Sequence, residues 1–293
     1  MAYKISWYYI PISIIIVIAI IAYILYKKMK SFISIEATQF CYINVIPELY
    51  PFTTSDYDHK NAKALYFIAR STTKWCICKG FEPPSIPNFT MIAAFKMNDK
   101  GKYIKNTLIF YSESLNTMII SFAGSKNLED WIADLQYTTR KPSFTDDDSV
   151  KAHSGFLTMY EGIRQNIKIV IDDTCDENTV VVVTGHSLGA GLATICYYDI
   201  CENNIIKKPM LYTFASPRIG NPQFAEKINA TKTAYRVANM EDMVPSVPFP
   251  LMGGQSYAHS GKMIPFSINL GSVAKNHSSA YSAHFNKDDP DDI

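Results

Sequence analysis

A serine between two glycines is the most chemically informative feature of the sequence. Gly185-His186-Ser187-Leu188-Gly189 fits the pattern G-x-S-x-G, follows the four valines Val180–Val183, and precedes a helical pattern from Leu188 to Ile200. A sharp turn between a buried strand and a helix lifts a serine hydroxyl clear of the sheet and needs small flanking residues. Ser187 is therefore the candidate nucleophile of a hydrolase that forms a covalent intermediate, and a tight structural turn is the alternative.

A serine nucleophile needs two partners further along the chain. A histidine must accept the serine proton and a carboxylate must orient that histidine, and in this type of turn the order is serine, acid, histidine. Asp242 comes directly after a predicted strand and is the candidate acid, with Glu241 as the fallback. A solvated loop carboxylate is the alternative for both. Chain order does not choose a base among the downstream histidines, which are His259, His277 and His284.

Strands and helices alternate along the sequence, which predicts an α/β fold with a mostly parallel central sheet flanked by helices. The length of 293 residues suits one such domain. Expected strands cover 91–96, 107–111, 116–122, 178–184, 210–215 and 234–238, and expected helices cover 156–171, 188–200 and 222–229, with a further helical pattern at 63–70.

Further segments accompany the serine turn in a fixed order between about residues 118 and 284. They are Ile120-Ser-Phe-Ala-Gly124-Ser125, Asp130-Trp-Ile-Ala-Asp-Leu135, His153-Ser-Gly-Phe156, Phe214-Ala-Ser-Pro-Arg-Ile-Gly-Asn-Pro222 and Asp242-Met-Val-Pro245. This series resembles the class 3 lipases, typified by secreted fungal triacylglycerol lipases. The resemblance implies an α/β-hydrolase fold and hydrolysis of lipid carboxylic esters, with acylglycerols as the expected substrates. It implies no cofactor.

The resemblance also implies which histidine is the base. Asn276-His277-Ser-Ser-Ala-Tyr281 is similar to the D/N-H-x-x-Y segment near the end of the family's domain, with one extra residue. His277 is therefore the expected base. His259 resembles a family histidine that is not catalytic, and His284 is expected at the surface.

Two donors are expected to stabilise the negative charge that develops on the carbonyl oxygen. The resemblance implies Ser125 and Leu188 as this oxyanion hole. Leu188 can donate only its backbone N–H, at the start of a helix, whereas Ser125 can donate its N–H and its hydroxyl. Ala123 replaces the arginine that commonly precedes Gly124 in the family, a departure expected to loosen the loop without removing the donors.

An amphipathic segment after Ser125 resembles the lid of these lipases, which covers the site in water and opens at a lipid surface. Its apolar residues follow the helical spacing i, i+3, i+4 and i+7. Burial favours such a stripe in both the closed and the open state. An ordinary packed surface helix is the alternative. The expected lid residues are Leu128, Trp131, Ile132 and Leu135.

The amino-terminal segment from Trp7 to Tyr26 contains no charged residue and is long enough to cross a bilayer as a helix. We therefore expect a membrane anchor over residues 1–30 and a lipase-like domain over residues 31–293. A cleaved secretory leader is the alternative, although Tyr26 and its neighbours are bulky for a cleavage site. Lys27, Lys28 and Lys30 follow the apolar segment and favour a cytoplasmic catalytic domain, with secretion as the alternative.

Composition adds few constraints. The net charge of +1 gives no electrostatic reason to expect a nucleic-acid partner. Cys76-Ile77-Cys78 lacks the spacing of a zinc site, so no metal is expected. Sequons at Asn88, Asn229 and Asn276 matter only if the domain faces a lumen. The cysteines do not decide the compartment and are spread through the domain, at Cys41, Cys76, Cys78, Cys175, Cys196 and Cys201.

The sequence thus predicts a membrane-anchored serine esterase that acts on lipid esters through an acyl-enzyme. Three alternatives stay open. The first is a phospholipase or diacylglycerol lipase of the same fold, and the second is a lipase-like scaffold without turnover. The third is a membrane-interaction factor whose main element is the apolar segment. Oligomeric state and acyl specificity are not predicted.

Overall fold

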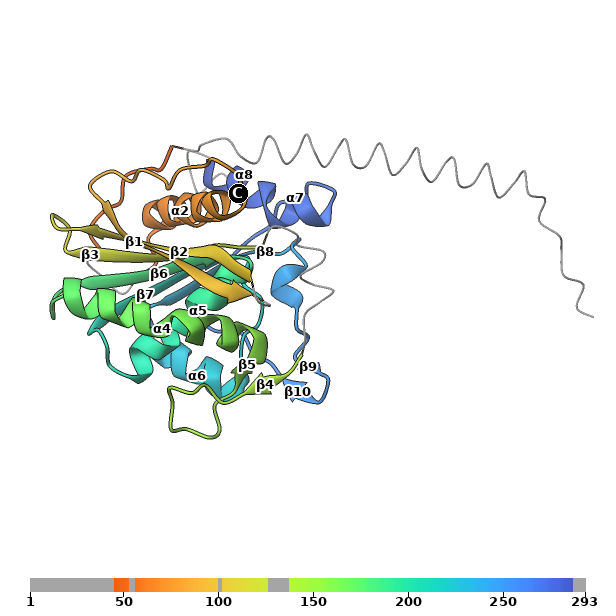
Figure 1. Cartoon of the computed structure of the whole chain (residues 1–293). Coiled ribbons are helices and arrows are strands. Elements are labelled where there is room, and N and C mark those ends of the chain that lie inside the picture. Colours follow the sequence, from red (N-terminus) through yellow and green to blue (C-terminus); the bar gives the residue numbers. More distant parts are fainter. Residues whose placement is uncertain (1–44, 53–55, 100–101, 126–136, 287–293) are drawn as a thin grey trace, which may run out of the picture. The chain divides into compact units, whose positions relative to one another are not determined.

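A seven-stranded sheet forms the centre of the described part of the chain (Figure 1). The computed structural model describes residues 45–52, 56–99, 102–125 and 137–286. Neighbouring strands are antiparallel from β1 to β3 and parallel from β3 onward. In sheet order, the strands are β1 (Thr90–Asp99), β2 (Lys102–Ser112), β3 (Thr117–Phe122), β6 (Val180–His186), β7 (Lys208–Phe214), β8 (Ala234–Asn239) and β11 (Lys262–Phe266).

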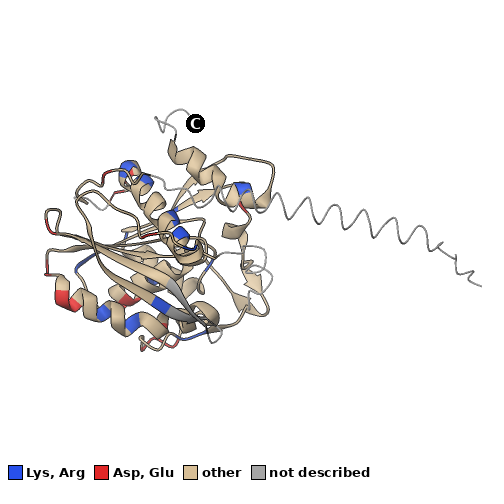
Figure 2. Cartoon of the chain, turned by 45° about the horizontal axis from the view of Figure 1, so that its top comes forward, with Lys and Arg blue, Asp and Glu red and all other residues tan. Residues whose placement is uncertain are grey.

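Helices cover both faces of this sheet (Figure 1). On one face lie α4 (Ser154–Thr174), α5 (Leu188–Glu202) and α6 (Pro222–Ala230). On the other lie α2 (His59–Ile77) and α8 (Ser279–Asn286). Helix α4 carries residues of both charge signs along its length, as the colours in Figure 2 show. The predicted α/β class with a mostly parallel central sheet is confirmed.

Smaller elements follow the long strands at their carboxyl ends. The short 3-10 helix η1 (Val244–Ser246) follows β8, and α7 (Val273–His277) follows β11. Two short hairpins complete the described part, namely β4 (Thr139–Arg140) with β5 (Ala152–His153), and β9 (Leu251–Met252) with β10 (Gln255–Ser256).

The valine run is buried on both sides of the sheet, as a parallel central strand requires. Val181 and Val183 pack in the core beneath α4 and α5, whereas Val182 packs in the core beneath α2. Side chains alternate between the faces of a strand, so consecutive valines serve both cores. The prediction of a buried strand before Ser187 is therefore confirmed.

Helix α2 is longer than the predicted segment 63–70 and continues through Thr72 and Thr73. Threonine is a weak helix former, but both hydroxyls donate to carbonyl oxygens one turn earlier, to Ile68 and Ala69. β11, α7 and α8 were not predicted from the sequence.

None of the helices in the described ranges is long and apolar enough to cross a membrane. The predicted anchor over residues 1–30 lies outside the described residues, and so do the four predicted lid residues. Residues 45–286 fall within one compact unit, Ile43–Ile293.

Candidate active site

Ser187 occupies a strained turn between β6 and α5. Its φ of 61° and ψ of −125° are unusual for a residue with a side chain. The backbone N–H of Ser187 donates to the carbonyl oxygen of Phe214 on the neighbouring strand, at 3.0 Å. This contact ties the turn to the sheet, and such strained backbone persists only where the surroundings enforce it.

Positions 185 and 189 have no room for a side chain, so both must be glycine. A Cβ on Gly185 would lie 2.2 Å from the backbone oxygen of Gly189, and a Cβ on Gly189 would lie 2.3 Å from the backbone oxygen of Phe122. Both clashes involve backbone atoms, which cannot move aside without breaking the turn. The two glycines of the G-x-S-x-G pattern therefore have a direct steric cause.

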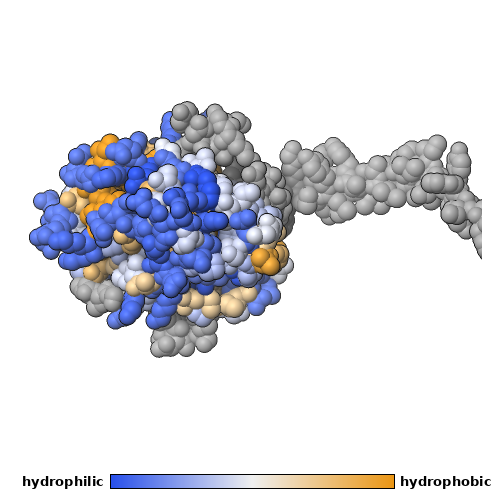
Figure 3. Space-filling view, turned by 90° about the horizontal axis from the view of Figure 1, so that it is seen from below, coloured by the Kyte–Doolittle hydropathy of each residue, from blue (hydrophilic) through white to orange (hydrophobic). Residues whose placement is uncertain are grey.

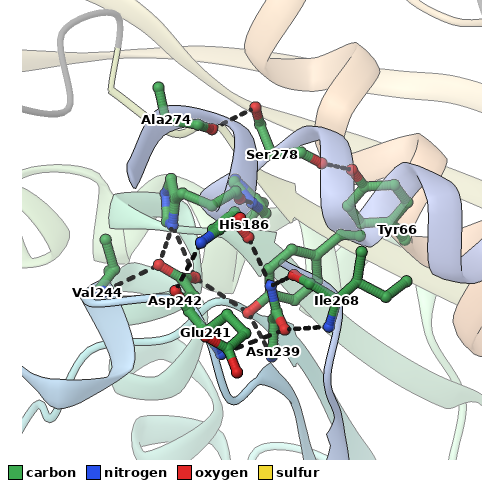
Figure 4. Close-up of polar contacts among 12 residues, drawn as sticks. Tyr66, His186, Asn239, Glu241, Asp242, Val244, Ile268, Ala274 and Ser278 are labelled. Carbon is green, nitrogen blue, oxygen red and sulfur yellow. Dashed lines mark hydrogen bonds and ion pairs between the residues drawn. The ribbon is translucent and has the colours of Figure 1, made fainter. Parts of the chain in front are cut away.

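Asp242 and His277 form a buried pair. Asp242 follows β8, His277 is the last residue of α7, and each is 4% exposed. His277 Nδ1 lies 2.9 Å from Asp242 Oδ2 and 3.1 Å from Oδ1. The carboxylate also accepts the Val244 N–H at 3.0 Å and the Tyr281 hydroxyl at 3.1 Å (Figure 4). These contacts fix both the carboxylate and the imidazole it faces.

His277 presents its second nitrogen without a partner. Nε2 is buried and has no hydrogen-bond partner among the described residues. Its ring lies 4.7 Å from the ring of His186, which directly precedes Ser187. No Ser187–His277 hydrogen bond is formed, and such contacts often shorten only when substrate binds.

The other candidates do not contact this pair. Glu241 is exposed and accepts hydrogen bonds from Ser267 and Asn269. His259 bonds the Pro245 carbonyl; burial lowers its pKa to about 3, with further lowering by Arg236 and Arg218. His284 is buried and stacks on Phe266 at 4.1 Å, so the expected surface position for it is wrong.

The predicted oxyanion residues flank the serine turn. Leu188 begins α5, whose amino end carries no side-chain cap, so its first N–H groups are available to an anion. Ser125 follows Gly124, where a Cβ would lie 3.7 Å from the Ser187 Cβ. The Gly124 N–H donates to Thr73 Oγ1 of α2 at 2.8 Å. Thr73 was not singled out from the sequence, because nothing local links it to a loop fifty-one residues away.

His186 connects the Ser187 turn to the segment that carries His277. Its Nε2 lies 2.8 Å from the backbone oxygen of His277, a contact that requires Nε2 to carry the proton. Burial lowers the pKa of His186 well below its usual value, and the neighbouring His277 and Arg70 lower it further. His186 is therefore a neutral donor. Burial also raises the pKa of Tyr281 well above its usual value, with Asp242 adding to the shift, so Tyr281 keeps its proton for Asp242.

Large apolar side chains are exposed in the part of the chain that follows β8. Between β8 and β11 they are Met240 (61% exposed), Met243 (58%), Phe249 (57%) and Leu251 (76%). The face formed by α4 and α6 is instead mainly hydrophilic (Figure 3). These exposed apolar side chains were not predicted from the sequence.

Comparison with known proteins shows which family the chain resembles. Residues 119–252 match the family described as Lipase (class 3). This match covers less than half of the chain, and over this stretch the chain resembles the class 3 lipases. A "Lipase" of Rhizomucor miehei is 31% identical over 166 residues, which cover 55% of this chain and 44% of that protein. The predicted family resemblance is thus confirmed.

Other relatives of the chain carry different names. "Secreted mono- and diacylglycerol lipase A" of Penicillium cyclopium is 31% identical, over 49% of this chain and 46% of its own. "Phospholipase A1-Igamma3, chloroplastic" of Arabidopsis thaliana is 33% identical, over 45% of this chain and 30% of its own. The chain therefore spans less than half the length of these curated relatives.

A solved triacylglycerol lipase, described as having a serine protease triad as its catalytic centre, shares the fold. It superimposes with a TM-score of 0.52 at 26% identity and covers 61% of this chain and 66% of its own. The predicted α/β-hydrolase lipase fold is confirmed by this match.

Proposed function

We propose that this chain is a class 3 lipase, a serine carboxylic-ester hydrolase that cleaves lipid esters, with acylglycerols as its substrates. The observation that carries the proposal is the strained Ser187 turn beside a buried Asp242–His277 pair. Strain at one polar residue, next to an oriented imidazole with an unpartnered nitrogen, has a ready explanation in nucleophilic catalysis.

The geometry suggests a two-step mechanism. Ser187 Oγ attacks the ester carbonyl while His277 Nε2 takes its proton, and Asp242 stabilises the resulting imidazolium through Nδ1. The Leu188 N–H and Ser125 face the developing oxyanion, which contributes several kcal/mol. His277 then protonates the leaving alcohol. Water, activated by the same histidine, hydrolyses the acyl-enzyme and releases the fatty acid.

Lipid substrates are favoured by the exposed apolar side chains between β8 and β11, in the part of the chain that also carries Asp242. Exposed side chains such as Met240, Met243 and Leu251 gain free energy when they leave water for a lipid surface. The proposed lid residues are apolar in sequence as well, namely Leu128, Trp131, Ile132 and Leu135. Phospholipids are the second candidate substrate class, because one relative is named a phospholipase A1.

The proposal includes attachment to a membrane through residues 1–30. For the compartment, the lysines after the apolar segment favour a cytoplasmic domain. Cys78, however, is disulfide-bonded, which favours an oxidising compartment, and one relative is named as secreted. We therefore propose the lumenal or extracellular side for the catalytic domain.

Fatty-acid release from triacylglycerol, diacylglycerol and phospholipid dispersions tests the function, with Ser187→Ala prepared in parallel. We expect release by the full chain from an acylglycerol and its loss in Ser187→Ala. Release only from phospholipid would favour the second substrate class. Release by neither protein, from dispersions or from a soluble p-nitrophenyl ester, would favour the scaffold alternative.

A further inference from the structure

Asn239 is a buried amide at the carboxyl end of β8, three residues before Asp242. It is 1% exposed and lies on the sheet face that also carries Tyr235 and Val237, beneath α2 and α8. A buried amide is costly unless its polar atoms are paired. The partners of Asn239 therefore show what this residue is doing at the edge of the proposed site.

All four hydrogen-bonding positions of the Asn239 side chain are used (Figure 4). Nδ2 donates to the carbonyl oxygens of Ile268 and Asn276, at 2.9 Å and 3.0 Å. Oδ1 accepts the backbone N–H of Ile268 at 3.0 Å and that of Glu241 at 3.3 Å. The amide thus joins three chain segments at one point.

The segments that Asn239 joins carry the proposed acid and the proposed base. Glu241 directly precedes Asp242, and Asn276 directly precedes His277. The backbone N–H of Asn239 also donates to the Tyr281 hydroxyl at 3.0 Å, and that hydroxyl donates to Asp242. Asn239 is therefore hydrogen-bonded to the residue before the proposed acid, to the residue before the proposed base, and to the tyrosine that holds the carboxylate.

The side-chain amide of Asn276 makes a second connection between the same two segments. Asn276 Nδ2 donates to the carbonyl oxygen of Glu241 at 3.1 Å, and its Oδ1 accepts the Leu270 N–H at 2.6 Å. The sequon at Asn276 is consequently buried, at 8% exposure, with its amide engaged inside the protein. Asn239 and Asn276 together link the residue before the acid to the residue before the base twice.

We propose that Asn239 is a positioning residue for the Asp242–His277 pair. The inference rests on the proposed function, because it assigns Asn239 to the machinery of that same site. Asp242 and His277 lie on separate loops, so their contact needs something that fixes one loop to the other. Misplacing a catalytic group by about 1 Å can lower a rate by about 100-fold. A purely structural amide would instead affect only stability.

Asn239→Ala tests the proposal, with Asn61→Ala as the matched control. Asn61 is also 1% exposed, and its amide also bonds backbone atoms on both sides, accepting the Tyr50 N–H and donating to the Tyr50 carbonyl. It lies near the start of α2, away from the proposed site. Should Asn239→Ala fail to fold, Asn239→Ser keeps one hydroxyl for a single bond and serves in its place.

Two readouts are measured on the full chain. The first is kcat and KM for a soluble p-nitrophenyl ester, corrected for the folded fraction from thermal unfolding. We expect Asn239→Ala to lower kcat by about 10- to 100-fold with little change in KM. Asn61→Ala should lose stability and keep its kcat.

The second readout is the NMR signal of the proton that His277 Nδ1 shares with Asp242, which does not depend on turnover. In Asn239→Ala the carboxylate is no longer held against Nδ1, so this hydrogen bond should weaken and its downfield proton signal should move upfield or be lost. An inactive parent chain with this change would refute the proposed function and leave the positioning role standing. Equal kcat in the two folded variants, or an unmoved His277 Nδ1 proton signal, would overturn the inference.

Discussion

The serine turn and the acid–base segments are held in place by different means. Around Ser187 the restraint is steric and local. A Cβ on Gly185 or Gly189 would clash with backbone atoms within a few residues of Ser187 or on the next strand. Around Asp242 and His277 the restraint is a set of side-chain hydrogen bonds between segments far apart in the chain, made by Asn239, Asn276 and Tyr281. Local sterics leave a signature in the sequence, whereas long-range hydrogen bonds do not.

The largest expected effect comes from a change in the hydrogen-bonded segments around Asp242 and His277. Asp242→Asn keeps the shape of the side chain but no longer stabilises a protonated His277 through Nδ1. We expect kcat for a soluble ester to fall by about 10⁴-fold, as for the corresponding change in other serine triads. Glu241→Gln is the control, because Glu241 is exposed and does not contact His277. Equal losses in the two variants would mean that the acid is assigned wrongly.

Gly185→Ala tests the steric restraint on the Ser187 turn. The new Cβ would lie 2.2 Å from the Gly189 carbonyl oxygen, so the turn must distort. We expect a loss of about 3 kcal/mol or more in the free energy of unfolding, measured by urea denaturation, together with loss of esterase activity. At Gly162 of α4 an added Cβ meets nothing within 4 Å. Gly162→Ala should therefore be neutral or stabilising by up to about 1 kcal/mol, and equal effects at both glycines would contradict the steric account.

Buried neutral histidines make the stability of the folded protein sensitive to acid. The pKa of His259 falls from 6.5 to about 3 in the folded protein. Between these values the unfolded chain binds a proton that the folded chain does not, so stability decreases as pH falls below about 6.5, by about 1.4 kcal/mol per pH unit. His186 contributes in the same direction. Urea unfolding at pH 7, 6 and 5 should show a shallower loss in His259→Asn, and an unchanged slope would argue against a neutral buried His259.

The smallest effect sharpens the comparison at the oxyanion loop, where a backbone N–H depends on a distant hydroxyl. Thr73→Val removes the acceptor for the Gly124 N–H at nearly constant volume. We expect kcat to fall by about 10-fold at a cost of about 1 kcal/mol in stability. The neighbouring Thr72 bonds Ser121 instead, so Thr72→Val should lose similar stability and keep its kcat. If Thr72→Val slowed turnover as much, the role of Thr73 would be disproved.

What the sequence reveals follows the same division. The strand, turn and helix around Ser187 are predictable, because valines, glycines and helical periodicity act over a few residues. Bare chain order leaves three histidines open, and the choice of His277 depends on family resemblance. Thr73 and Asn239 carry no local signal, since their partners lie on other elements. The extension of α2 was missed because threonine is a weak helix former. The hydroxyl bonds that Thr72 and Thr73 make within the helix are visible only in the structure.

Covalent labelling tests the central claim most directly. The full chain is treated with a fluorophosphonate, and the modified residue is located by peptide mass spectrometry. We predict one labelled position, Ser187, with labelling abolished in Ser187→Ala and slowed in Asp242→Asn. Labelling of another residue, or none by a folded protein, would contradict the assignment of Ser187 as an activated nucleophile.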